Sequence, residues 1–129
     1  MVNSRDKGKR GELMARDVIR KYWYAPRCER AGQTSGDVSA DVVRALPKSH
    51  VEVKYLKSIA AFRFHGQALR DAEQDELPLV MMRETGVDSW LLMFDARRAE
   101  DFVARFLRQM FLTCGPEAAD RFVQDSLHG

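Results

Sequence analysis

The sequence predicts a single α/β domain in which a mixed central sheet is flanked by helices and followed by a C-terminal helical extension. Three features predict this class: apolar residues at helical spacing near the start, a hairpin pattern over residues 41–54, and two continuous apolar runs followed by amphipathic segments. A chain of 129 residues has the size of one domain and can bury a core. Its hydrophobic content of 45% and charged content of 31% are ordinary for a globular protein.

The charges are distributed unevenly along the chain. Residues 1–30 carry nine Lys or Arg and four Asp or Glu, a balance of +5, so the remainder balances at −3 within the total of +2. A basic N-terminal segment is what a phosphate-binding surface would need, but a solvated helix face has the same composition. Both interpretations stay open.

Composition also argues against several classes of protein. Cys28 and Cys114 are too few for a disulfide framework, and together with the three histidines they show no zinc-ligand spacing. No apolar run approaches transmembrane length, and residues 1–11 lack the apolar segment of a signal peptide. We therefore expect a cytoplasmic protein that makes no use of a membrane.

The N-terminal part of the chain is predicted to form a tail, a helix, a strand and a loop. Residues 1–8 should be a loose basic tail, and residues 9–23 a helix with one apolar stripe. Residues 24–31 should form the first strand. Residues 32–36 should form a loop that lacks the glycine spacing of a nucleotide-binding loop. Glu12, at the edge of the apolar stripe in the first helical turn, is either a helix-dipole partner or a metal carboxylate.

The stretch over residues 41–54 carries the most chemistry. Two apolar runs flank a turn at residues 46–49, as in a β-hairpin with a longer loop. Because side chains alternate along a strand, Glu52 and Lys54 point to one face, and Asp41 on the preceding strand can reach the same face. Two carboxylates and an ammonium suit a hard cation such as Mg²⁺ and a water that attacks phosphorus. A solvated hairpin face with a Glu–Lys pair is the simpler alternative.

A second aspartate competes with Asp41 for this role. Asp37 lies four residues earlier and is also acidic and close to the hairpin. Asp41 is preferred because Val42 and Val43 follow it directly, as a strand should, and because the eleven-residue step to Glu52 suits a hairpin. The choice between the two aspartates stays open.

The C-terminal part is predicted to alternate helix and strand before it ends in two helices. The continuous apolar runs at residues 79–82 and 90–94 suit strands buried on both faces, and residues 84–88 suit the turn between them. Asp95 suits the N-cap of the helix that follows. The predicted elements are a helix at 65–74, these two strands, and helices at 97–110 and 117–127 separated by Gly115-Pro116.

Asp41, followed by Glu52-Val53-Lys54 on a strand, resembles the core motif of the PD-(D/E)XK nuclease superfamily. The resemblance covers roughly residues 8–94 and extends to the Holliday-junction-resolvase-like branch, which includes small phage endonuclease-like proteins. Ala40 stands where the proline of the superfamily's name often stands, so the motif is not present in its strict form. The supporting motifs, in order, are Gly8-Lys9-Arg10-Gly11-Glu12, Arg30-Ala31-Gly32-Gln33 and Gln67-Ala68.

This resemblance implies a restriction-endonuclease-like core of order αβββαβ over residues 9–94, with residues 95–129 as a helical extension. It implies metal-dependent hydrolysis of DNA phosphodiester bonds that leaves a 5′-phosphate, first on branched junctions and second on linear or nicked DNA. A four-way junction has two-fold symmetry, so a homodimer is expected. The alternatives are a catalytically silent DNA-binding or assembly module of the same fold, and a structural α/β protein with a fortuitous hairpin.

The resemblance also implies roles for single residues. Asp41 and Glu52 would bind Mg²⁺, or Mn²⁺ as a substitute, with the backbone carbonyl of Val53, and Glu12 would complete the metal site. Lys54 would position the attacking water.

Gln67 would support that site from the second helix, although an exposed helix residue is the equal alternative. Ordinary solvent-facing positions also remain the alternative for the expected DNA contacts, which are Lys9, Arg10, Arg16, Arg30, Gln33 and Ser35.

Overall fold

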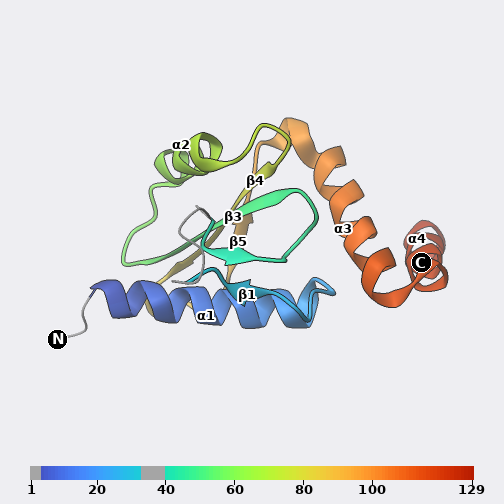
Figure 1. The fold of residues 1–129 in the computed structure, drawn as a ribbon, viewed down its shortest axis with the longest axis horizontal. Coiled ribbons are helices and arrows are strands. Elements are labelled where there is room, and N and C mark those ends of the chain that lie inside the picture. Colours follow the sequence, from blue (N-terminus) through green and yellow to red (C-terminus); the bar gives the residue numbers. More distant parts are fainter. Residues whose placement is uncertain (1–3, 33–39) are drawn as a thin grey trace.

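The computed structural model describes residues 4–32 and 40–129. It confirms an α/β fold with a five-stranded mixed sheet flanked by helices (Figure 1). The elements in chain order are α1 (Ser4–Tyr22), β1 (Glu29–Arg30), β2 (Val42–Val43), β3 (Ser49–Leu56), α2 (Ala61–Asp71), β4 (Leu77–Glu84), β5 (Leu91–Met93), the short 3₁₀ helix η1 (Ala96–Arg98), α3 (Ala99–Cys114) and α4 (Pro116–His128).

The strands lie in the order β1-β2-β3-β4-β5. The first three are antiparallel neighbours, β3 and β4 are parallel over eight residue pairs, and β5 returns antiparallel to β4. A parallel pair needs a crossover, and α2 supplies it. The predicted hairpins are both present, with Val42 opposite Val51 in the first and Met81 opposite Leu92 in the second.

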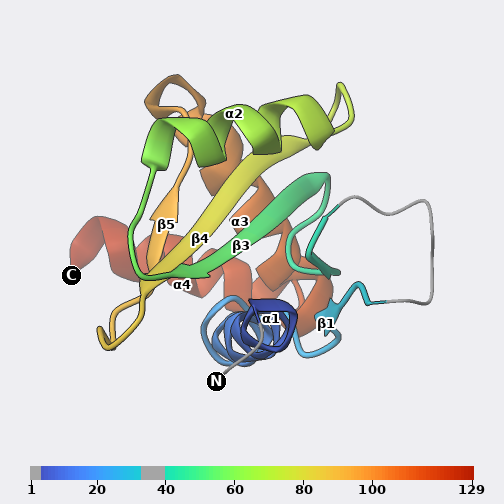
Figure 2. The ribbon, with the colours of Figure 1, turned by 90° about the vertical axis from the view of Figure 1, so that its left-hand side faces the viewer.

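Helices cover both faces of the sheet (Figure 2). On one face α1 and α3 pack on β3 and β4, where Ile19 and Leu79 are fully buried. On the other face α2 places Phe64 against Val80. Alternation along β3 therefore sends Val51 toward α1 and its two neighbours toward α2.

Two predicted boundaries at the N-terminal end are wrong. The first helix begins at Ser4, so residues 4–8 are helical and do not form a loose tail. The first strand has only two residues, Glu29 and Arg30, because the chain turns before it. Tyr24 has a φ of 55°, a left-handed conformation that extended strands do not use.

Three later predictions also need correction. The second helix begins at Ala61 and ends at Asp71, a few residues earlier than predicted. β4 is buried on both faces as predicted, but β5 is an edge strand and Leu91 is 58% exposed. Asp95 caps η1, where its side chain accepts from the Arg97 N–H, and not α3 itself.

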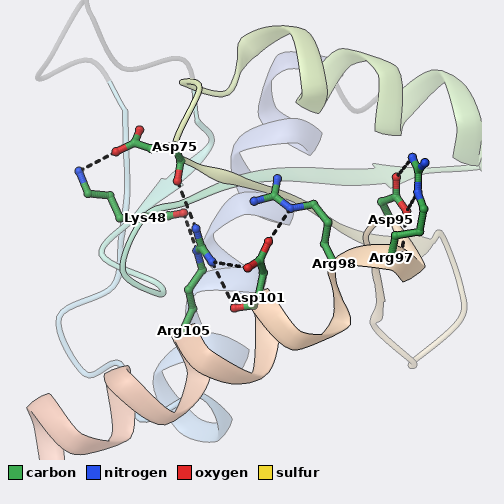
Figure 3. Close-up of polar contacts among 7 residues, drawn as sticks. All are labelled: Lys48, Asp75, Asp95, Arg97, Arg98, Asp101 and Arg105. Atoms are coloured by element: carbon green, nitrogen blue, oxygen red, sulfur yellow. Dashed lines mark hydrogen bonds and ion pairs between the residues drawn. The ribbon is translucent and has the colours of Figure 1, made fainter.

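Of the two C-terminal helices, α3 packs against the core and α4 lies beyond it, away from the sheet (Figure 1). α3 packs through Phe102, which stacks on Phe94 with a centroid distance of 4.9 Å and meets Trp23 edge-on. Polar contacts add to this packing, since Arg105 donates to the Lys48 carbonyl at 3.0 Å (Figure 3). By contrast, α4 buries none of its residues.

Across residues 4–32 and 40–129, no helix is long and apolar enough to cross a bilayer.

Candidate active site

Two acidic side chains meet at the open end of the β2–β3 hairpin. Asp41 directly precedes β2, and the Val42–Val51 register places it opposite Glu52. Its backbone N–H donates to the Val51 carbonyl at 2.9 Å, and its carboxylate accepts the Val53 N–H at 2.7 Å. Each carboxyl group influences the pKa of the other. The hairpin therefore holds the Asp41 carboxylate through the backbone and places it beside Glu52.

These two carboxyl groups have opposite pKa shifts. Burial raises the pKa of Asp41 to about 7, and the charges of Glu52 and Glu12 add to this, while the Val53 N–H opposes it. Burial would also raise the pKa of Glu52, but hydrogen bonds from His50 and Asp41 and the charge of nearby Lys54 bring it below its usual value. The pair therefore disfavours two charges at once: Asp41 keeps its proton to a higher pH than usual, and Glu52 loses its proton at a lower pH than usual.

His50 lies two residues before Glu52 on β3 and forms a hydrogen bond with it. The sequence did not lead us to expect His50 at this site. His50 is 1% exposed and Glu52 is 2% exposed, and His50 Nε2 lies 2.8 Å from Glu52 Oε1. Burial opposes protonation of the imidazole, but the bond to Glu52 and the charges of Glu52, Glu76 and Asp71 raise the His50 pKa overall. The alternation rule that pairs Glu52 with Lys54 also places His50 on their face, so the signal was present.

Asp71 at the end of α2 is the second residue that the sequence reasoning missed. Ligand atoms of His50, Glu52 and Asp71 all lie within 4.8 Å of one another, a grouping that could hold a metal ion. Asp71 is one helical turn from Gln67, so both residues lie on the side of α2 that faces β3. Spacing on α2 could have indicated this pair, but its approach to His50 depends on how the helix packs.

Lys54 and Gln67 are in direct contact. Lys54 Nζ donates to Gln67 Oε1 at 2.8 Å and lies 5.3 Å from the centre of the Phe64 ring. The charge of Lys54 acts on the pKa of Glu52, so the ammonium is close to the carboxyl pair. Strand β3 and helix α2 thus bring together Glu52, Lys54 and Gln67.

Glu12 reaches the same region from α1 but has a different immediate partner. Arg30 Nε donates to Glu12 Oε2 at 2.5 Å, and both side chains are largely buried. Glu12 affects Asp41 through its charge. The expected DNA contact Arg30 is therefore bound to the expected metal ligand Glu12, a pairing that the sequence reasoning did not foresee.

The remaining expected DNA contacts fall into three groups. Lys9 and Arg10 are exposed on α1. Arg16 is bonded to its neighbour Asp17 at 2.9 Å. The expected contacts Gln33 and Ser35, and the competing acid Asp37, lie outside the described residues.

The donor set fits a hard divalent cation. Neighbouring carboxyl groups that disfavour each other's charge would both ionise more readily with a cation between them. The ligand atoms that the structure brings within 4.8 Å of one another belong to His50, Glu52 and Asp71, and Asp41 lies opposite Glu52 on the neighbouring strand. Comparison of the chain with protein-family models, curated proteins and solved structures found no match.

Proposed function

We propose that this protein is a metal-dependent endodeoxyribonuclease of the PD-(D/E)XK type, with branched DNA as its preferred substrate. The observation that carries the proposal is the placement of Asp41 opposite Glu52 at the open end of a hairpin, with Lys54 on the same strand held by Gln67. The strand and helix order αβββαβ over α1 to β4 is the order that the resemblance implies for the core. Fold and residues thus support the same class of chemistry.

In this mechanism Asp41 and Glu52 would hold Mg²⁺ or Mn²⁺, with the Val53 carbonyl as a further ligand. The bound ion would polarise a phosphoryl oxygen and lower the pKa of a coordinated water. Lys54 would orient that water for attack on phosphorus and offset the developing negative charge. The water oxygen forms the new bond to phosphorus and the bond to the 3′-oxygen breaks, which leaves a 5′-phosphate and a 3′-hydroxyl.

Gln67 and His50 would act through other residues. Gln67 accepts a hydrogen bond from Lys54, which fixes the direction of the ammonium. His50 bonds one oxygen of Glu52, which would leave the other oxygen for the cation. Such supporting contacts hold ligands in the orientation that a metal requires.

A catalytically silent DNA-binding module with the same fold is the second candidate. It is favoured by one contact: Glu12, the acid expected to complete the metal site, is neutralised by Arg30 at 2.5 Å. A site with one carboxylate withdrawn would still present a basic surface to DNA. Binding and cleavage must therefore be measured separately.

The test is cleavage of a labelled four-way junction beside a linear duplex of the same sequence, with Mg²⁺, Mn²⁺ or chelator. The variant Glu52→Gln keeps the shape and the contact with His50 but removes the charge. We expect it to lower metal-dependent cleavage at least about a hundredfold, since even residues that only support a metal ligand cost about 10–100-fold. Glu84→Gln, an exposed position at the end of β4, is the matched control.

Three results would decide between the candidates. Junction-selective, metal-dependent cutting that Glu52→Gln abolishes supports the resolvase-like activity. Equal cutting of both DNAs keeps the nuclease and removes the junction preference. Junction binding without cutting under any metal favours the silent module.

A further inference from the structure

A cavity of about 570 Å³ opens at the closed end of the β2–β3 hairpin, at the opposite end of the hairpin from the carboxyl pair. Its walls come from the turn before β1, the turn between β2 and β3, and the last turns of α3. Apolar side chains such as Pro26, Pro47 and Leu112 form part of the wall, and Arg27 and Arg44 also line it. The volume is within the usual range for small-ligand sites.

The two arginines supply uncompensated positive charge. Both are exposed, and among residues 4–32 and 40–129 neither has a hydrogen-bond or ion-pair partner. Some arginines are engaged, as Arg30 is with Glu12, whereas Arg70 and Arg121 are exposed like Arg27 and Arg44. What distinguishes Arg27 and Arg44 is that both line the same cavity. Two free guanidinium groups at one cavity form a site for an anion, since each can bind phosphate oxygens bidentately.

The turns that carry this cavity adopt an uncommon backbone conformation. Tyr24, Arg44 and Lys48 have φ values of 55°, 60° and 53°, and within the described ranges no other residue besides glycine has a positive φ. All three lie in the two turns that border the cavity. Left-handed conformations are unfavourable for such residues and persist only where the surroundings hold them.

Side chains of helix α3 hold these two turns through hydrogen bonds to their backbone. Gln109 Nε2 and Thr113 Oγ1 both donate to the Tyr24 carbonyl, at 2.9 and 2.7 Å. Arg105 Nε donates to the Lys48 carbonyl at 3.0 Å (Figure 3). The helix beyond the nuclease-like core thus fixes both turns, and with them the backbone at the cavity.

We propose that this cavity binds one backbone phosphate of the substrate DNA strand, with its deoxyribose against the proline and leucine walls. Asp41 directly precedes β2 and Arg44 directly follows it, so the carboxyl pair and the cavity lie at the two ends of one short strand. Phosphate contacts set the register of a protein on DNA, so the cavity would position the strand for cleavage. The proposal rests on the proposed function for its choice of DNA.

The test measures DNA affinity by fluorescence anisotropy over a range of salt concentrations, with chelator present so that nothing is cut. For Arg27→Ala/Arg44→Ala we expect about tenfold weaker binding and a slope of log K against log salt that is less steep by about 1, the value for one lost phosphate contact. Arg27→Lys/Arg44→Lys should keep the slope, because it keeps the charge. Both arginines are exposed, so thermal unfolding should be unchanged.

The control is Arg70→Ala/Arg121→Ala, which removes the same charge from exposed positions on α2 and α4. We expect its slope to equal that of the wild type. If the salt slope of Arg27→Ala/Arg44→Ala also equals the slope of the control variant, the proposal is overturned. Tighter binding of a deoxynucleoside 5′-monophosphate than of duplex would overturn the assignment to a DNA strand.

Cleavage assays separate this proposal from the nuclease itself. If the salt dependence of DNA binding changes when Arg27 and Arg44 are removed, but no metal-dependent cutting is seen, the phosphate site is supported and the nuclease activity is rejected. If cutting depends on Glu52, but the salt dependence of binding does not change when Arg27 and Arg44 are removed, the nuclease activity is supported and the phosphate site is rejected. Absence of any DNA affinity in the wild-type protein would reject both.

Discussion

Asp41 is a residue whose protonation links the stability of the fold to pH. Its pKa in the folded protein is about 7 against an ordinary value of 3.8, because burial and neighbouring carboxylates disfavour the ion. A carboxyl group with a raised pKa contributes stability at low pH that is lost as the pH rises through the folded value. Without metal, the protein should therefore lose stability between pH 5 and pH 8.

Replacement of Asp41 by Asn should remove most of that pH dependence. Asn keeps an oxygen that can accept the Val53 N–H but never ionises. We expect the free energy of unfolding of wild-type protein to fall by roughly 1–2 kcal/mol more than that of Asp41→Asn between pH 5 and pH 8, after allowance for partial exposure. Urea unfolding at the two pH values, in chelator, measures the difference.

His50 contributes a trend in the same direction, since its pKa is also raised. His50 is present in both the wild type and Asp41→Asn, so the difference between them reports the contribution of Asp41. Glu52 has a lowered pKa, and its contribution is lost only in acid. Addition of Mg²⁺ at pH 8 should raise the unfolding temperature of the wild type and leave Asp41→Asn nearly unchanged. An equal rise in both would argue against Asp41 as a metal ligand.

At this scale the sequence predicts residues of one strand well and contacts between elements poorly. Alternation and hairpin spacing place Glu52, Lys54 and Asp41 together because these rules are local. The Glu12–Arg30 pair and the approach of Asp71 depend on how helices pack on the sheet. No local pattern encodes that packing.

The approach of α1 to β3 depends on one glycine. A Cβ built on Gly11 would lie 2.6 Å from the Tyr55 Cβ, whereas one built on Gly8, also within α1, meets nothing within 4 Å. Gly11 thus permits the helix to pass close to the strand that carries Glu52 and Lys54. Two glycines near the helix start also explain why the sequence predicted a later beginning, since glycine is a weak helix former.

These two glycines make a matched pair of substitutions. Gly11→Ala should destabilise the protein by about 1–3 kcal/mol, because the added carbon meets a side-chain atom close to the backbone. Gly8→Ala should stabilise it by about 0.5–1 kcal/mol through helix propensity alone. Chemical denaturation of both variants checks the prediction, and destabilisation of similar size in both would refute the close-approach argument.

At the scale of the whole molecule, the class and the order of elements were predictable because hydrophobic periodicity reports them. The positions of single elements within the fold were not predicted correctly. The run at residues 90–94 is as apolar as β4, yet β5 is an edge strand, since its position depends on how many strands follow. Likewise, no pattern indicated that α3 would fix the turns at Tyr24 and Lys48.

The expected homodimer can be tested on the two C-terminal helices. Val103 and Phe122 line an apolar hollow between α3 and α4, and Val103 is 53% exposed. If this surface joins two copies, Val103→Asp should shift sedimentation of the protein from dimer to monomer. The exposed position Gln124→Asp, which adds the same charge outside the hollow, serves as control. A monomeric wild type would exclude the homodimer.

α4 contacts α3 but buries none of its own residues, so its backbone amides can reach solvent by local opening, without global unfolding of the sheet. Amides of β4, buried along most of its length, should exchange only when the whole protein unfolds. If a second copy covers α4, its hydrogen-exchange rate will fall as protein concentration rises, while that of β4 stays constant.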